Sequence, residues 1–333
     1  MSATDLTRAV WAVDADDYPA EAPIEERARF CLRYAILAPS SHNAQPWRFR
    51  IEGGRIHVAA DESRWLRAAD PDRRELFVSL GCAVENLVVA AEGFGVDAAV
   101  TYPEDDTDRV ATVTLGGDGD APAERSALFD ALTTRRTSHD PFDGAPLGAA
   151  MRDRLAAAGD ADAVTVRFVD GDAKRAVGEL QAEADRLQMD DPAYRAELGR
   201  WIGLGALGQS WLLARVGQAV VTHLDLGDRE AAKNSQLIES APALAVLATD
   251  TDDPTARVEA GRAFERIALR ASAAGVAVHP MSQVLERPDC RERLAATLGL
   301  GGAKPQHLFR LGYADESVDH TPRWPVEMVL DAE

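Results

Sequence analysis

The sequence predicts a globular protein of mixed helices and strands, built from two related halves. The main observation is a repeated order of elements: a long apolar helix, a glycine stop and a strand occur at residues 75–102 and again at residues 254–279. The repeat distance is roughly half the chain, far longer than the period of a solenoid. The second observation is size, because 333 residues with 46% hydrophobic content can bury one large or two moderate cores.

Composition and charge argue against several classes of protein. A net charge of −19 disfavours nucleic acid and an anionic membrane as partners, because binding either needs local positive charge. The three cysteines, Cys31, Cys82 and Cys290, are scattered and lack metal-ligand spacing, which favours a reducing compartment. The N-terminal residues lack a basic region followed by an apolar run, and we expect no apolar stretch of about 18 residues. The sequence therefore predicts a cytoplasmic protein.

The first half should begin with an amphipathic helix over residues 24–37, which carries apolar side chains at helical spacing. The pair Gly53-Gly54 then supplies the positive dihedrals of a tight hairpin turn. A helix at 75–93 is apolar almost all round, so it should lie at the centre of its core. The other expected elements are hairpin strands at 47–51 and 55–59, a surface connection at 61–74, strands at 98–102 and 111–115, and an acidic, glycine-rich boundary at 116–122.

The second half should begin with a helix at 124–132 and end with a strand at 307–313. A second long apolar helix, at 254–275, is again ended by glycine. The segment 201–213 is rich in Gly, Leu and Trp and suits either an ordinary packed turn or a flexible loop over a pocket. The remaining expected elements are helices at 147–158, 173–189 and 287–298 and strands at 164–169, 243–249 and 276–279.

A polar loop follows the first helix, between Pro39 and Pro46. Proline cannot continue the helix, so the chain must turn here. The hydrogen-bonding side chains of the loop are those of Ser40, Ser41, His42, Asn43 and Gln45. Ser and Asn readily bond their own backbone, so such a loop either caps a helix or binds a ligand.

Two adjacent arginines, Arg135 and Arg136, follow the helix at 124–132 and precede Ser138 and Pro141. A guanidinium fork suits a phosphate, and neighbouring hydroxyls can complete its hydrogen bonds. The alternative is a pair of solvated charges that complement the helix dipole. The residues alone leave both interpretations open.

Four segments, in this order along the chain, resemble the flavin-dependent nitroreductase family. They are PSSHNAQPWRF after the first helix, RRTSHDPF after the helix at 124–132, HPMSQ after the second long helix, and FRLGYA with TPRWP near the end. The resemblance covers most of residues 24–330. It implies an α+β, nitroreductase-like fold with mixed, mainly antiparallel sheets flanked by helices. In that family two subunits intertwine, and each FMN sits at their interface.

This chain carries the PSSxN loop once and the Arg-x-Ser segment once, in different halves. The resemblance therefore implies two degenerate repeats that pack as a pseudo-dimer, with one composite FMN site and one degenerate site. The closest pattern is that of the fused single-chain, dormancy-associated (Acg-like) nitroreductase-like proteins. We expect a monomer divided into an N-terminal extension at 1–23, a first half at 24–122 and a second half at 123–333.

The resemblance also implies the cofactor-binding residues. Arg136, Ser138 and Arg323 would surround the FMN phosphate and ribityl chain, where phosphate pairs supply affinity. The backbone amides of the Pro280–Ser282 segment would face the N5 and O4 edge of the flavin. From the loop, the implied ligands are Pro39, Ser40, Ser41 and Asn43; near N5 they are Pro280, Met281 and Ser282; at the pyrimidine edge they are Asn234 and Gln236.

Two departures from the family pattern make the phosphate site less positive than usual: Asp140 and Thr321 stand where basic residues are common. His42 and His139 are either acid/base groups or ordinary loop histidines. The resemblance implies no catalytic nucleophile and no metal.

The resemblance implies an FMN-dependent oxidoreductase that passes electrons from NAD(P)H through FMN to a nitroaromatic or quinone-like small molecule. The protein would provide positioning and hydrogen bonds, because the redox chemistry belongs to the cofactor. No GxGxxG follows a strand, so no separate Rossmann nicotinamide site is expected. The alternative is a protein that sequesters or stores FMN under a lid with little turnover, and a plain scaffold without flavin is a third possibility.

Overall fold

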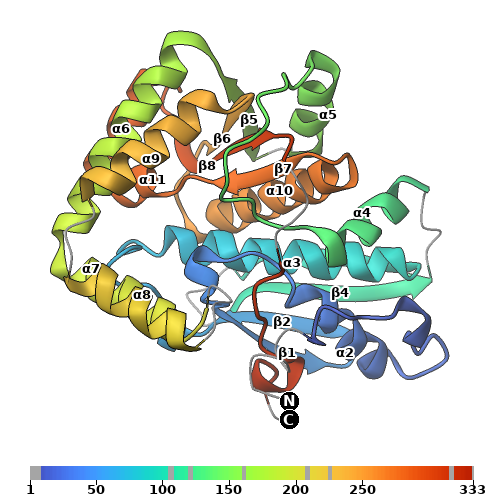
Figure 1. The fold of residues 1–333 in the computed structure, drawn as a ribbon. Coiled ribbons are helices and arrows are strands. Elements are labelled where there is room, and N and C mark those ends of the chain that lie inside the picture. Colours follow the sequence, from blue (N-terminus) through green and yellow to red (C-terminus); the bar gives the residue numbers. More distant parts are fainter. Residues whose placement is uncertain are drawn as a thin grey trace.

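The computed structural model describes residues 9–103, 109–118, 123–159, 163–206, 211–223, 227–314 and 319–331. Two four-stranded sheets lie one above the other, and two long helices lie between them (Figure 1). These helices are α3 (Arg74–Gly93) and α10 (Pro254–Ala273), which pack directly against each other. The named strands of both sheets pair antiparallel, so the predicted α+β class is confirmed.

The first half supplies the lower sheet of Figure 1, with strand order β1-β2-β4-β3. Trp47 and Phe49 of β1 and Ile56 and Val58 of β2 are buried, because alternate residues of a strand share one face. The elements of this half are α2 (Ile24–Ala35), β1 (Trp47–Glu52), β2 (Arg55–Ala60), α3, β3 (Val96–Thr101) and β4 (Arg109–Asp118).

The second half supplies the upper sheet, with strand order β5-β6-β8-β7. All of β6 (Ala243–Thr249) is buried, since α10 covers one face and outer helices cover the other. The other elements are α4 (Ala123–Thr134), α5 (Ala149–Gly159), β5 (Val164–Val169), α6 (Gly171–Asp190), α7 (Pro192–Gly203), α8 (Trp211–His223), α9 (Gly227–Ser240), β7 (Ala277–Pro280), α11 (Gln283–Glu286), α12 (Pro288–Thr297) and β8 (Lys304–Gly312).

Both halves repeat one arrangement, in agreement with the repeat expected from the sequence. Each has two strands, a 20-residue helix and two further strands, and the spatial order of the four strands is the same. The division of the chain at residue 122 stays a prediction, since residues 119–122 lie outside the described part.

Glycines set the contact between the two long helices. A Cβ atom on Gly81 would lie 2.1 Å from the carbonyl oxygen of Val258, and one on Gly261 would lie 2.1 Å from that of Val78. The two glycines are 180 residues apart, and so are the two valines. Each half therefore contributes the same contact at equivalent positions. Backbone therefore meets backbone where α3 and α10 cross, and any side chain there would push the halves apart.

The sequence located most strands well and missed several helices. Strands at 164–169 and 243–249 were predicted to the residue, whereas α7, α8, α9 and α11 were not predicted. The segment 201–213 comprises the end of α7, a turn at residues 204–206 and the start of α8, and residues 207–210 within it are outside the described part.

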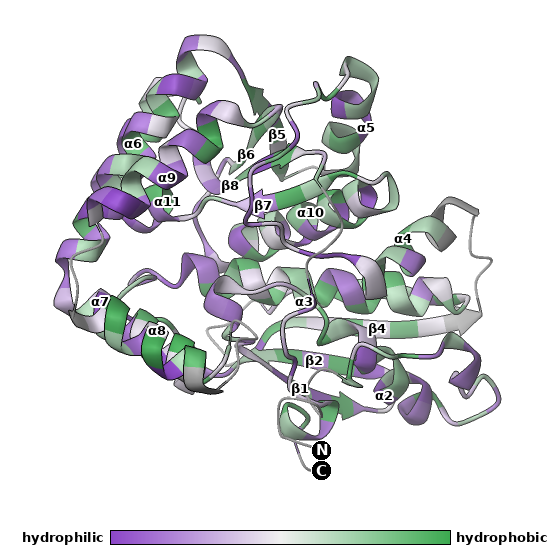
Figure 2. Ribbon diagram, viewed as in Figure 1, coloured by the Kyte–Doolittle hydropathy of each residue, from purple (hydrophilic) through white to green (hydrophobic). Residues whose placement is uncertain are grey.

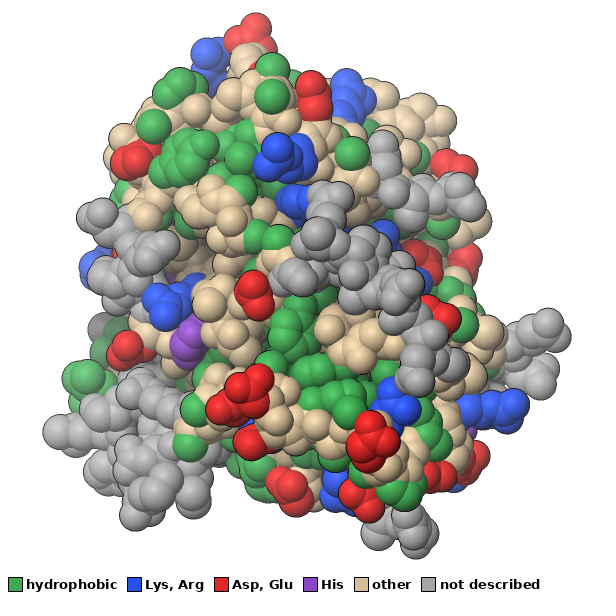
Figure 3. Space-filling model, turned by 90° about the vertical axis from the view of Figure 1, so that its right-hand side faces the viewer, with side chains coloured by type: hydrophobic (Ala, Val, Ile, Leu, Met, Phe, Trp, Pro, Cys, Tyr) green, Lys and Arg blue, Asp and Glu red, His purple; other side chains and the backbone are tan. Residues whose placement is uncertain are grey.

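The expectation that no long apolar stretch occurs is wrong for α3. This helix is long and apolar enough to cross a membrane, but 83% of its most apolar window is buried inside the protein. It is the core helix of the molecule, and Figure 2 shows its hydrophobic residues between the sheets. On the face shown in Figure 3, acidic and basic side chains are interspersed, so the negative net charge is not gathered there in one patch.

The C-terminal segment returns to the first half. Its backbone pairs with β1, since Phe49 N–H donates to Val329 O (2.8 Å) and Asp331 N–H donates to Phe49 O (2.8 Å). Residues 319–325, just before this pairing, are thereby held beside the loop that follows α2.

Candidate functional site

Three segments meet at one carbonyl oxygen. Leu37 O, at the start of the loop after α2, accepts hydrogen bonds from Arg135 Nη2 (3.0 Å) and Arg323 Nη2 (3.2 Å). Beside them, Arg136 Nε donates to His320 Nε2 (3.4 Å). The loop, the arginine segment after α4 and the C-terminal segment thus converge. The contact between the loop and the arginine segment is made by Leu37 and Arg135, and the ligand roles expected for Ser40–Asn43 and Arg136–Ser138 stay predictions.

Positive charge is concentrated at this meeting point. Arg135 and Arg323 are both buried, and the ion pair between Arg135 Nε and Glu265 Oε1 (3.1 Å) supplies the opposing charge. Burial, followed by the charge of Arg135, lowers the pKa of Arg323 to about 9, while Glu265 acts in the opposite direction. Burial, followed by the charges of Arg136, Arg135 and Arg323, lowers the pKa of His320 to about 4. The site therefore attracts anions in a chain whose net charge is strongly negative.

The loop after α2 holds an unusual backbone. His42, Asn43 and Gln45 have φ values of 50°, 52° and 53°, in the left-handed region that non-glycine residues rarely adopt. Such a conformation persists only where the surroundings determine it. Here Asn43 Nδ2 donates to Ala206 O (2.7 Å) and Pro322 O (2.9 Å), and Asn43 Oδ1 accepts from Arg323 Nη1 (2.7 Å).

These contacts indicate that the side chain of Asn43 binds other parts of the chain, whereas the prediction was that it binds the flavin. Both of its amide protons are used inside the chain, and its carbonyl oxygen is held by a guanidinium group. Asn43 therefore joins the loop, the C-terminal segment and the end of α7, which sequence alone could not reveal.

The two serines keep part of their hydrogen-bonding capacity. Ser40 Oγ accepts from Gln45 N–H (2.9 Å), so its hydroxyl proton remains to be donated. Ser41 Oγ donates to Glu75 Oε2 (2.6 Å), so it can only accept from a ligand. Pro39, half-buried, precedes them. Burial lowers the pKa of His42 to about 4, which keeps its ring neutral at ordinary pH.

The arginine segment lies along β7. Thr137 pairs with Val278, and the buried Ser138 donates its N–H to Val278 O (3.1 Å). Arg310 of β8 donates through Nη2 to Ser138 O (3.2 Å) and Asp140 O (2.8 Å). Both arginines follow the end of α4. Arg135 is buried because its side chain turns toward Glu265 of α10, whereas Arg136 is exposed.

The predicted flavin-edge segment needs a correction. It begins at Pro280, the last residue of β7, and so lies close to the arginine segment, but Met281 N–H donates to Leu308 O (2.7 Å) and the Met281 side chain is buried. Pro280 has no N–H. Of the three predicted residues, only Ser282 retains a backbone amide that can face a ligand.

Asn234 and Gln236 point in different directions. Asn234 is buried on α9 and donates through Nδ2 to Asp185 Oδ2 (3.0 Å). Gln181 Nε2 donates to Asp185 Oδ1 (3.1 Å) and Gln283 Oε1 (2.8 Å), so Asn234 is linked to the residue after Ser282. Gln236 is exposed and lines a separate surface hollow of about 450 Å³. The prediction that Gln236 and Asn234 lie together at the pyrimidine edge of the flavin is therefore not supported.

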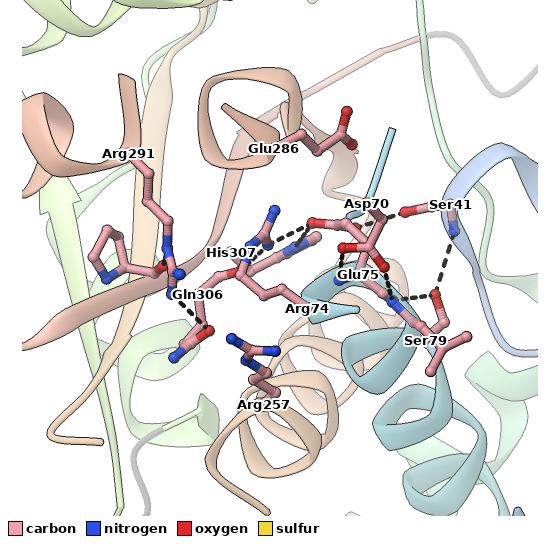
Figure 4. Close-up of polar contacts among 12 residues, drawn as sticks. Ser41, Asp70, Arg74, Glu75, Ser79, Arg257, Glu286, Arg291, Gln306 and His307 are labelled. Atoms are coloured by element: carbon pink, nitrogen blue, oxygen red, sulfur yellow. Dashed lines mark hydrogen bonds and ion pairs between the residues drawn. The ribbon is translucent and has the colours of Figure 1, made fainter. Parts of the chain in front are cut away.

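A buried polar cluster at the start of α3 was not foreseen (Figure 4). Arg74 Nη1 donates to Glu75 Oε1 (2.6 Å) and Gln306 O (2.6 Å), and Glu75 also holds Ser41 of the loop. Burial acts to raise the pKa of Glu75, but Arg74 and His307 bring it down to about 2. The cluster anchors the loop to the core. In the sequence, Arg74 and Glu75 resemble any charged helix start, so no signal identified them.

No family model matches the chain. It is 30% identical over 310 residues to "Putative NAD(P)H nitroreductase Rv3131" of Mycobacterium tuberculosis, covering 91% of this chain and 90% of that protein. It is 26% identical over 310 residues to "Putative NAD(P)H nitroreductase acg" of the same organism, covering 90% and 93%.

Among solved structures, the FMN-dependent nitroreductase NfnB from Mycobacterium smegmatis, in complex with NADPH, aligns with a TM-score of 0.45 and 19% identity. That alignment covers 62% of this chain and 98% of the other. The similarity in sequence to the mycobacterial proteins covers about nine-tenths of the chain and so includes parts of both halves.

Proposed function

The chain belongs to the nitroreductase family, and from this premise we propose that it binds one FMN between its two halves and passes electrons from NAD(P)H to a small acceptor, such as a nitroaromatic compound or a quinone. The observation that carries the proposal is the group of three guanidinium groups, on Arg135, Arg136 and Arg323, around Leu37 O and His320. The names of the mycobacterial relatives support NAD(P)H as the electron donor.

The residues present fit a phosphate ester. Arg135 and Arg323 are buried beside a single carboxylate, Glu265, so the buried group has an excess of positive charge. Within the described residues, Arg323 Nε is buried without a hydrogen-bond partner. Leaving such a charged donor unpaired costs free energy, and an anionic oxygen would compensate it. Arg136, exposed at the rim, completes a phosphate site.

When bound, FMN supplies the hydride and electron chemistry. The chain's own residues position it: Arg136 and Arg323 hold the phosphate, Ser40 donates a hydroxyl proton, and Ser282 offers a backbone amide. The hydrogen bonds among Asn234, Asp185 and Gln181 join α9 to α6, and the bond from Gln181 to Gln283 joins α6 to the residue next to Ser282.

The charges at the related position support a single site per chain. Glu85 of α3 lies 180 residues before Glu265 and pairs with Arg262 (3.0 Å) and Arg266 (2.6 Å). Glu259 also pairs with Arg262 (2.8 Å), so two carboxylates balance two guanidinium groups there. With no positive excess, this position lacks the charge that a second phosphate needs. The charges therefore support one FMN per chain, and the monomeric pseudo-dimer and the cytoplasmic location stay predictions from the sequence.

A second candidate function is FMN storage with little turnover. The observation that favours it is the attachment of α7 to the first half: Asn43 Nδ2 bonds Ala206 O, and Glu197 accepts from the N–H groups of Ala68 (3.2 Å) and Ala69 (2.9 Å). Helices fixed in this way would restrict access of an electron acceptor to the flavin.

One experiment separates these functions. The purified protein is examined for flavin absorbance near ~450 nm and for flavin-to-chain stoichiometry, and NADPH or NADH is then added without oxygen. A reductase with one site gives one FMN per chain and rapid bleaching. Bound flavin that neither nicotinamide bleaches would favour storage, and protein that fails to bind added FMN would overturn both candidates.

A further inference from the structure

A chain of two histidines lies next to the arginine segment. Arg310 Nε of β8 donates to His279 Nδ1 of β7 (2.9 Å), and His279 Nε2 lies 2.8 Å from His139 Nδ1. Arg310 and His279 are buried, whereas His139, which follows Ser138, is exposed. The hydrogen-bonded row Arg310–His279–His139 therefore runs from the core of the second half to its surface.

The donors and acceptors fix where each proton sits. Arginine has only donors, so His279 Nδ1 must accept and its proton must be on Nε2. That proton points at His139 Nδ1, which must accept in turn, so the proton of His139 is on Nε2. A second proton on His139 would set two N–H groups against each other.

The surrounding charges favour the same neutral state. Burial lowers the pKa of His279 well below its usual value, and His139, Arg310 and Lys233 lower it further. The His139 ring is exposed on one side only, because its other side packs against His279. The resulting loss of water, followed by the charges of Lys233 and Arg310, lowers the pKa of His139, while Asp140 acts in the opposite direction.

We propose that Arg310 and His279 fix His139 as a neutral hydrogen-bond donor, through Nε2, to an anionic oxygen of the nucleotide bound beside Arg136 and Ser138. The identity of the nucleotide rests on the proposed function. Nδ1 of His139 faces His279, so Nε2 points away from the core on the exposed side of the ring. Arg310 also holds the backbone on both sides of His139, at Ser138 O and Asp140 O.

The positive charges nearby explain why the acceptor is anionic. Lys233 of α9 acts on both histidines, and Arg310 Nη1 is buried without a hydrogen-bond partner within the described residues. The fixed positive charges attract the anionic oxygen, and the neutral N–H of His139 fixes its position through a directional hydrogen bond. Because His139 does not change its charge, its bond to the ligand stays the same across the physiological pH range.

The first test needs no ligand. Long-range ¹H–¹⁵N spectra of the full chain at pH 6.5 report the tautomer of each histidine, and the His139→Gln and His279→Gln variants assign the signals. We expect both rings to be neutral with the proton on Nε2. A proton on Nδ1 of either ring would overturn the proposal.

The second test measures FMN affinity by flavin fluorescence. His139→Phe keeps a ring but removes the donor, and the Kd should rise about tenfold. Thr134→Ala, an exposed residue at the end of α4, is the matched control and should not change the Kd. His279→Gln keeps a donor at the Nε2 position and should bind FMN like the wild type.

His279→Leu removes that donor, so His139 Nδ1 can take up a proton as the pH falls, while burial, Lys233 and Arg310 still hold the pKa of His139 below its usual value. Its affinity for FMN should then increase from pH 8 to pH 6 relative to the wild type, which serves as the reference for titration of the phosphate itself. A purely structural role of the histidines would give no such pH dependence and would refute the proposal, as would unchanged affinity in His139→Phe. If the wild type fails to bind FMN, the proposed function and the ligand assignment fail, and the spectra still decide the histidine tautomers.

Discussion

Replacing Arg135 should destabilise the protein in a pH-dependent way. Arg135 is 4% exposed and Glu265 is 0% exposed, and they form an ion pair at 3.1 Å. The change Arg135→Met keeps the aliphatic stem and removes the charge, which leaves the Glu265 carboxylate buried and unpaired. Breaking a buried pair in this way costs about 3–5 kcal/mol. The buried carboxyl can take up a proton instead, and the pKa of Glu265 is already about 7, so we expect a smaller loss in the free energy of unfolding at pH 8.0, about 2–2.5 kcal/mol.

The loss should shrink at low pH. Burial raises the pKa of Glu265 to about 7 despite Arg135, whereas an unfolded Glu titrates at about 4.3. Between these values the folded state holds a proton that the unfolded state has lost, so stability falls as pH rises from about 4.3 to 7. At pH 5.5 the carboxyl is protonated in both proteins, and the variant should lose only about 1 kcal/mol, the value of a neutral hydrogen bond.

Denaturant titrations of wild type and Arg135→Met at pH 5.5 and 8.0 measure both values. Adding Glu265→Gln to the variant removes the stranded charge and should restore most of the stability lost at pH 8.0. A loss that is equal at the two pH values, or no rescue by the second change, would show that Arg135 does not act by neutralising Glu265.

Three further changes test other parts of the structure. Arg136→Ala should weaken FMN binding about tenfold to a hundredfold and leave the free energy of unfolding within about 0.5 kcal/mol, because Arg136 is exposed; calorimetric titration and denaturation check this. Gly81→Ala should cost about 1–3 kcal/mol or more by collision with Val258 O, whereas Gly148→Ala, which meets open space, should not; their melting temperatures decide. Asn43→Ala should cost about 2–3 kcal/mol through its lost bonds and its φ of 52°, and equal stability to wild type in denaturant would contradict this.

The sequence was most informative where burial and periodicity coincide. The strand Ala243–Thr249 is a short, fully buried run that is apolar up to Thr249 and follows Pro242, and the helix Pro254–Ala273 repeats its apolar residues up to a glycine stop. By contrast, some apolar residues of α7 to α9 lie on exposed faces, as Leu213 and Val216 of α8 do. The spacing of apolar residues in this region therefore did not distinguish a helix from a loop.

At the site, the sequence identified the converging segments but not the role of each side chain. The register at the end of α4 decides that Arg135 turns inward and Arg136 outward, and no local pattern reveals it. The partners of Asn43 come from Ala206 and Pro322, more than 160 residues away, so they were invisible in the loop itself. The ligand roles of the site residues stay predictions until FMN binding is measured.

Two matching acidic residues, Glu85 and Glu265, have acquired different partners within one polypeptide. In an assembly of identical subunits any substitution is copied into every interface, so one location cannot change without the other. A covalently joined pair escapes that restriction. One side of such a molecule is free to specialise for chemistry while its counterpart becomes plain structural support.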